Sequence, residues 1–118
     1  MNILYIHGLE SLIIGSSMGG YFAYAIATST NQHCILLNPA VHSRAFEPAN
    51  VNYGLCHPNT TCVLGLNDNV INPEDTKKIL QFEPKIKFFE YNHGHRTPAG
   101  ILEKVINKII INDKKALV

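Results

Sequence analysis

This sequence of 118 residues has few long apolar runs and little net charge. No stretch approaches the roughly 18 consecutive apolar residues that a membrane-spanning helix needs. The formal net charge is only +1, which argues against nucleic acid as a partner. The first residues form an apolar, strand-like run rather than a basic leader. We therefore expect a cytoplasmic protein that binds neither membranes nor nucleic acid.

Cysteine is also scarce. Cys34, Cys56 and Cys62 stand singly, without the CxxC spacing of a zinc or redox motif. An odd count in a small chain is a poor disulfide framework, so we expect reduced thiols. Cys34 and Cys62 lie inside apolar runs, where packing rather than catalysis is the expected role.

The remaining composition is that of an ordinary globular protein, with 46% hydrophobic and 16% charged residues. A chain of this length forms one domain with a modest core, so we expect a single domain over residues 1–118. No internal repeat, linker or low-complexity tract divides it.

The hydrophobic pattern predicts strands that alternate with helices. The predicted elements, in chain order, are strands at 2–6 and 12–14, a helix at 21–30, strands at 34–37 and 61–66, a helix from 73 to about 82, a strand at 86–91 and a helix with an apolar face over 101–110. Such alternation predicts an α/β fold, with a mainly parallel sheet of about five strands and helices on both faces. Ligands of this architecture bind beyond the carboxyl ends of the strands.

The segment Gly15-Ser16-Ser17-Met18-Gly19 lies between the second predicted strand and the first predicted helix. A strand, a sharp turn that carries a serine and a helix together form a nucleophile elbow. Gly15 and Gly19 fit this interpretation, because a Cβ at either position would collide with the adjoining strand and helix. The pattern predicts that Ser17 is the nucleophile of a serine hydrolase.

An acid and two histidines follow later strands. Asp68 comes after the fourth predicted strand, and His93 and His95 come after the fifth. Serine, acid, histidine is the chain order of the α/β-hydrolase triad. A serine hydroxyl needs an imidazole to take its proton, and the imidazole needs a carboxylate to fix its tautomer. His95 is the expected base and His93 the alternative; together they lack the further ligands of a metal site.

Hydrolysis of an ester also needs donors for the negatively charged oxygen of the intermediate. The backbone N–H of Met18 follows the nucleophile and is the first expected donor. The turn after His7-Gly8 offers the backbone N–H of Leu9 as the second.

Five segments together resemble a known family. They are Tyr5-Ile6-His7-Gly8, Gly15-Ser16-Ser17-Met18-Gly19-Gly20-Tyr21, Leu37-Asn38-Pro39-Ala40, Gly65-Leu66-Asn67-Asp68 and Gly94-His95. They resemble the small bacterial YqiA/YcfP-type esterases of the α/β-hydrolase superfamily.

The resemblance implies a carboxylic ester or thioester as substrate and no metal or organic cofactor. It implies Ser17 as nucleophile, Asp68 as acid and His95 as base, with Leu9 and Met18 as oxyanion donors. For the Asn38-Pro39-Ala40 turn it implies a structural or pocket-edge role.

The chain departs from the family between its first two strands, where only Leu9-Glu10-Ser11 separates Gly8 from Leu12. A crossover between parallel strands takes at least ten to twelve residues. The first strand can therefore form an antiparallel hairpin, pair elsewhere, for example in a partner subunit, or mark a shortened derivative of a longer hydrolase. We favour the last interpretation, a minimal, truncated α/β-hydrolase fold.

Two functions follow from these observations. One is a minimal esterase that acts on small acyl substrates through Ser17, Asp68 and His95. The other is a catalytically impaired domain that serves as a binding module or has no enzymatic function. Self-association into a homo-oligomer would suit the second alternative, because a shortened domain gains stability from a partner.

Overall fold

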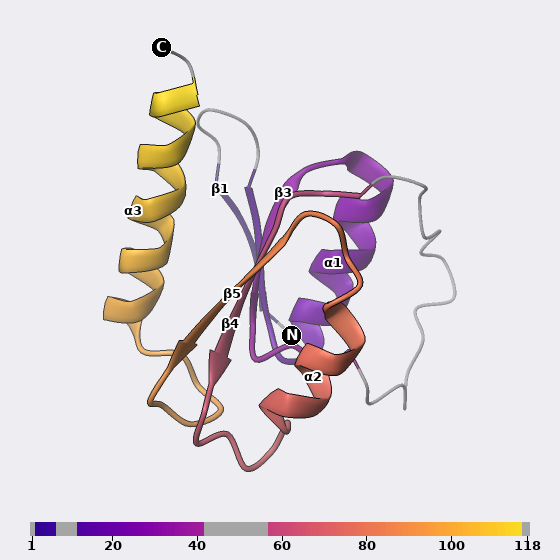
Figure 1. The fold of residues 1–118 in the computed structure, drawn as a ribbon, viewed down its shortest axis with the longest axis vertical. Helices are drawn as coiled ribbons and strands as arrows, with labels where there is room; N and C mark the ends of the chain where they lie inside the picture. The colour runs from indigo at the N-terminus through magenta and orange to yellow at the C-terminus, as the bar shows by residue number, and fades with distance from the viewer. Residues whose placement is uncertain (1, 7–11, 42–56, 117–118) are drawn as a thin grey trace.

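The computed structural model describes residues 2–6, 12–41 and 57–116 of the chain (Figure 1). These parts contain five strands and three helices. In chain order they are β1 (Asn2–Ile6), β2 (Leu12–Ser16), α1 (Met18–Thr30), β3 (His33–Leu37), β4 (Thr60–Gly65), α2 (Pro73–Leu80), β5 (Ile86–Tyr91) and α3 (Ala99–Ala116). The predicted α/β class is confirmed.

The strands form one sheet in the order β1-β2-β3-β4-β5. Strands β2 to β5 are parallel to one another. Ser16 pairs with Leu37 at the end of β2, and Gly65 pairs with Tyr91 at the end of β4. The carboxyl ends of β2 to β5 therefore lie along one edge of the sheet.

Strand β1 is the exception to the parallel pattern. It pairs with β2 in antiparallel fashion, with Asn2 opposite Ser16 and Ile6 opposite Leu12. This is the hairpin among the three arrangements expected for the first strand, and it needs no long crossover. The idea that the chain is a shortened hydrolase stays a prediction, because strand pairing does not test it.

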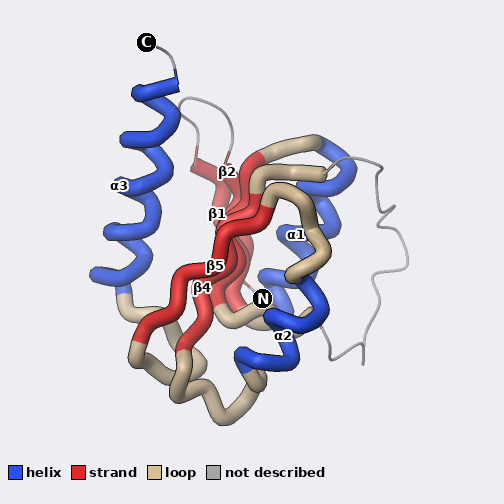
Figure 2. Tube along the Cα trace, viewed as in Figure 1, coloured by secondary structure: helices blue, strands red, loops and turns tan. Residues whose placement is uncertain are grey.

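Helices cover both faces of the sheet, as predicted (Figure 2). Helices α1 and α2 pack on one face, where Cys34, Leu36 and Leu80 are part of the core. Helix α3 packs on the other face, where Ile35 and Val105 are part of a second core cluster. Successive residues of β3 thus enter opposite layers, because strand side chains alternate between the two faces.

Local sequence signals explain where the helices begin and end. The Asn72 side chain caps α2 by accepting a hydrogen bond from the N–H of Glu74 at 2.9 Å, and Pro73 is the first helical residue. Helix α1 begins at Met18 rather than at Tyr21, because the turn at Ser17 leads directly into it. It ends at Asn31, which takes the left-handed conformation.

The described cysteines have the packing role expected from the sequence. Cys34 and Cys62 are buried and unpaired, and Cys56 lies outside the described residues. Burial raises the pKa of the Cys34 thiol to about 11, with Thr60 acting in the opposite sense through a hydrogen bond. Burial also raises the pKa of Cys62. Both thiols are therefore protonated and poor nucleophiles at neutral pH.

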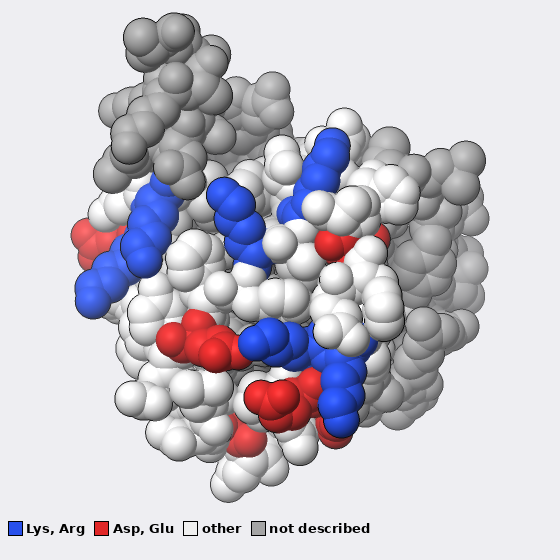
Figure 3. Space-filling model, in the orientation of Figure 1, with Lys and Arg blue, Asp and Glu red and all other residues white. Residues whose placement is uncertain are grey.

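Charged side chains of both signs lie on the face of the molecule shown in Figure 3. Lys77 and Glu90 form an exposed ion pair at 2.8 Å. Among the described residues, no helix is both long and apolar enough to cross a membrane.

Replacing Leu64 with alanine tests the core. Leu64 is almost completely buried between the sheet and the helices α1 and α2, so Leu64→Ala should lower the free energy of unfolding by about 2–5 kcal/mol. Leu66→Ala is the control, because it removes the same atoms from a residue that is 44% exposed. It should lower the free energy of unfolding by less than about 1 kcal/mol. Urea denaturation measures both; equal losses would contradict the assigned core.

Candidate active site

Ser17 lies in the turn between β2 and α1 with φ 56° and ψ −119°. This backbone conformation is unfavourable for a residue with a side chain. Four hydrogen bonds hold it. The N–H of Ser17 donates to Leu37 O at 2.9 Å, and its carbonyl accepts from the N–H groups of Gly20 at 3.0 Å, Ala40 at 2.9 Å and Tyr21 at 3.4 Å. The predicted strand, turn and helix around Ser17 are therefore present.

Small residues permit this turn. A Cβ at Gly15 would lie 2.8 Å from the Cβ of Ala23 and closer still to the carbonyl oxygen of Gly19. A Cβ at Gly20 would lie 2.8 Å from the Cβ of Pro39. The strand, the helix and the turn after β3 thus approach one another at distances that exclude a larger residue.

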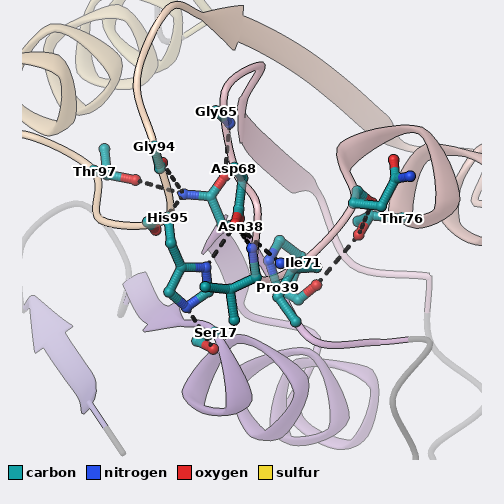
Figure 4. A network of polar contacts seen from close by, with 12 residues as sticks. Ser17, Asn38, Pro39, Gly65, Asp68, Ile71, Thr76, Gly94, His95 and Thr97 are labelled. Atoms are coloured by element: carbon teal, nitrogen blue, oxygen red, sulfur yellow. Dashed lines mark hydrogen bonds and ion pairs between the residues drawn. The ribbon is translucent and has the colours of Figure 1, made fainter.

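Ser17, His95 and Asp68 come together at the carboxyl edge of the sheet (Figure 4). His95 Nε2 lies 3.0 Å from Ser17 Oγ, and His95 Nδ1 lies 2.9 Å from Asp68 Oδ2. With its proton on Nδ1, the imidazole donates to Asp68 and accepts from the Ser17 hydroxyl. This is the arrangement in which an imidazole can take the proton of a serine.

Asp68 is 8% exposed, and its second oxygen is held by the backbone. Oδ1 accepts hydrogen bonds from the N–H groups of Val70 at 2.8 Å and Ile71 at 2.9 Å. Burial raises the pKa of Asp68, but the hydrogen bonds from His95, Ile71 and Val70 outweigh it, so the pKa lies below its ordinary value. Asp68 is therefore ionised at neutral pH and oriented toward His95.

His93, the alternative base, has different neighbours. Its Nδ1 lies 2.7 Å from the carbonyl oxygen of Gly94, and its ring packs against Gly65. The residue is 8% exposed, and its Nε2 is buried without a hydrogen-bond partner among the residues that the structure describes. His95, rather than His93, contacts both Ser17 and Asp68.

The structure describes one of the two expected oxyanion donors. Met18 is the first residue of α1, and the first N–H groups of a helix have no partner within the helix. Leu9 lies outside the described residues. Strand β1, which precedes it, ends at Ile6 opposite Leu12, at the edge of the sheet away from Ser17.

Two comparisons with known proteins find similarity. Residues 2–49, less than half of the chain, match the model of an uncharacterised protein family, UPF0227. The fold is similar to the crystal structure of a predicted CIB-like hydrolase from Thermoplasma acidophilum, with a TM-score of 0.60 and 18% identity. The chain has an α/β-hydrolase-like fold. The similarity covers 81% of this chain and 48% of that hydrolase, so the chain spans about half of its length. No curated protein matches.

Two features of the site in this α/β-hydrolase-like fold escaped the sequence analysis. The first is the pair of hydrogen bonds that the N–H groups of Val70 and Ile71 donate to Asp68. The signal for it was Asn67-Asp68-Asn69, a typical turn sequence in which a carboxylate binds nearby N–H groups. The central position of Asn38 in the network was not foreseen either. The available signal in the sequence was asparagine itself, directly after a predicted strand, because asparagine tolerates the left-handed conformation that Asn38 adopts.

Gly15→Ala should disrupt the turn at Ser17. Because the new Cβ would collide with the backbone of Gly19, the free energy of unfolding should fall by at least about 2 kcal/mol. Gly100→Ala is the matched control, since a Cβ there meets nothing within 4 Å, and it should leave stability unchanged or raise it by up to about 1 kcal/mol. Thermal and urea unfolding measure both; a fully stable Gly15→Ala protein would contradict the packing described.

The lowered pKa of Asp68 predicts a stability that depends on pH. Below its unfolded pKa, near 3.9, the unfolded chain binds a proton that the folded protein still excludes. The stabilisation is complete above that pH and is lost as the pH falls through the folded value. The free energy of unfolding should therefore fall as the pH drops below about 5, and less steeply in Asp68→Asn.

Urea denaturation at a series of pH values measures this slope. Asp75→Asn is the matched control, because Asp75 is an exposed carboxylate in the first turn of α2. Slopes that are the same in Asp68→Asn and Asp75→Asn would contradict the environment described for Asp68.

Proposed function

We propose that the protein is a serine hydrolase that acts on small carboxylic esters or thioesters. Ser17 is the nucleophile, His95 the general base and Asp68 the acid that orients it. The observation that carries the proposal is the continuous line of contacts from Ser17 Oγ through both ring nitrogens of His95 to Asp68 Oδ2.

The proposed reaction has two steps. His95 Nε2 takes the proton of Ser17 as its oxygen attacks the acyl carbonyl, and the protonated imidazole then gives that proton to the departing alcohol or thiol. A water molecule, deprotonated by His95, next attacks the acyl group, and His95 returns the proton to Ser17 Oγ as the carboxylic acid product leaves. Asp68 stabilises the protonated imidazole in both steps, a task that suits a carboxylate kept ionised by backbone N–H groups.

The N–H of Met18 is the proposed first donor to the oxyanion. Its position at the start of α1 adds the positive end of the helix dipole to the hydrogen bond. The N–H of Leu9 stays a prediction as the second donor. Loss of one such donor costs on the order of a hundredfold to a thousandfold in rate, so an enzyme with Met18 alone would be slow but measurable.

Exposed apolar side chains support an acyl substrate. Met18 directly follows the nucleophile and is 44% exposed, and Leu66 and Val70, at 44% and 65%, flank Asp68 in the chain. Such side chains can contact the hydrocarbon part of an acyl group. No metal or cofactor takes part in the proposed steps, and a cytoplasmic location remains a prediction from the sequence.

The comparisons support this function in general terms. The match to the family model spans the turn at Ser17, and the structural neighbour is described as a hydrolase. The chain's resemblance to small esterases adds the ester or thioester as substrate class.

One observation favours the second candidate, a catalytically impaired domain that binds acyl compounds or other proteins. In the antiparallel hairpin, β1 ends at the edge of the sheet away from Ser17. A first strand that ran parallel to β2 would end at the edge where Ser17 lies. The second oxyanion donor is therefore the weakest part of the esterase proposal.

A fluorophosphonate probe, which reacts with activated serines, distinguishes the two candidates. The wild-type protein should be labelled on Ser17, and Ser17→Ala should not be labelled. Asp68→Asn should react about a thousandfold or more slowly, because an amide cannot stabilise the protonated His95. Ser29→Ala makes the same change on the exposed side of α1 and should be labelled at the wild-type rate.

Peptide mapping by mass spectrometry identifies the labelled residue. Labelling that persists in Ser17→Ala would exclude Ser17 as the nucleophile. A folded wild-type protein that the probe does not label would favour the impaired domain.

A further inference from the structure

Asn38 directly follows β3 and lies at the centre of the polar network in Figure 4. Its side chain is one of the few fully buried polar groups in the described parts of the chain, and the residue is 2% exposed. Its φ of 43° is in the left-handed region. A buried amide in a strained backbone conformation needs strong contacts to remain there.

The carboxamide of Asn38 uses both of its ends. Its Oδ1 accepts a hydrogen bond from the N–H of Gly65 at 2.6 Å, at the end of β4. Its Nδ2 donates to the carbonyl oxygen of His95 at 2.7 Å, with Thr97 Oγ1 at 3.4 Å and the carbonyl oxygen of Gly94 at 3.5 Å. One side chain thus joins the strand that leads to Asp68 and the loop that carries His95.

The backbone around Asn38 contacts the remaining parts of the site. The N–H of Asn38 donates to Val63 O at 2.9 Å, and the carbonyl of Leu37 accepts from Ser17 at 2.9 Å. Ala40 donates to the carbonyl of Ser17 at 2.9 Å. The turn after β3 is therefore bonded to the segments of all three site residues.

Asparagine suits this position for two chemical reasons. It tolerates the left-handed conformation better than most residues, and its carboxamide offers an acceptor and a donor on one rigid plane. Aspartate keeps the acceptor for the N–H of Gly65 but loses the donor to His95 and places a charge against a carbonyl oxygen. Asn38→Asp therefore removes the hydrogen bond to His95 and keeps the hydrogen bond from Gly65.

We infer that Asn38 is a positioning residue that holds the His95 loop so that the imidazole stays between Asp68 and Ser17. The inference rests on the proposed function for its catalytic consequence, but the placement of His95 can be measured without any reaction. A displacement of about 1 Å in a catalytic group can cost on the order of a hundredfold in rate. Asn38 thus affects proton transfer without touching the substrate.

Asn38→Asp is the test variant, and Asn31→Asp is its matched control. Asn31→Asp makes the same change at another left-handed asparagine, which is exposed and lies at the opposite end of α1 from Ser17. The first measurement is the proton NMR signal of His95 Nδ1–H, which a hydrogen bond to Asp68 moves downfield. The second is kcat and KM for hydrolysis of p-nitrophenyl acetate.

The signal should be lost or shifted in Asn38→Asp and unchanged in Asn31→Asp. The kcat should fall about tenfold to a hundredfold in Asn38→Asp with little change in KM, because the variant alters proton transfer rather than substrate contact. A folded Asn38→Asp protein with the wild-type His95 signal would overturn the inference, and so would an altered signal with a wild-type kcat. If the wild-type protein hydrolyses no ester, the proposed function fails, and the NMR signal alone decides the role of Asn38.

A measurement on the wild-type protein covers the case in which Asn38→Asp does not fold. The carboxamide protons of Asn38 should exchange with solvent far more slowly than those of Asn31, because they are buried and bonded to His95. Exchange at the same rate for both side chains would overturn the inference.

Discussion

The parallel register of β2 to β5 is the constraint on which the site depends. It aligns the ends of these strands, so that residues far apart in the chain, Ser17, Asp68 and His95, meet at one edge. The two apolar layers maintain this register, because a shift by one residue would turn the side chains of β3 to the wrong faces. The geometry of the polar site is thus a consequence of the packing beneath it.

The sheet alone does not bring the three side chains within hydrogen-bonding distance. Two residues with positive φ at its edge, Ser17 and Asn38, turn the chain after β2 and β3. Hydrogen bonds from other strands and loops compensate for the strain of these conformations. The same hydrogen bonds hold the Ser17 hydroxyl and the His95 imidazole in place, which is the preorganisation that the proposed acyl transfer would require.

Much of this arrangement follows from the sequence. The helix start at Asn72-Pro73 and the turn at Ser17 depend on neighbouring residues, so local patterns predict them. The antiparallel direction of β1 does not follow, because an apolar run of five residues reads the same in both directions. The contacts of Asn38 escape prediction for another reason: its partners Gly65 and His95 are 27 and 57 residues away in the chain. Only the folded sheet brings them together.

The central claim is that Ser17, His95 and the start of α1 form one reactive centre. A crystal structure of the protein after reaction with a phosphonate inhibitor tests it most directly, since the phosphonyl group imitates the charged intermediate. The account predicts phosphorus bonded to Ser17 Oγ, one phosphonyl oxygen within about 3 Å of the N–H of Met18 and His95 still bonded to Asp68. Phosphorus on another residue, or a phosphonyl oxygen directed away from Met18, would contradict the account.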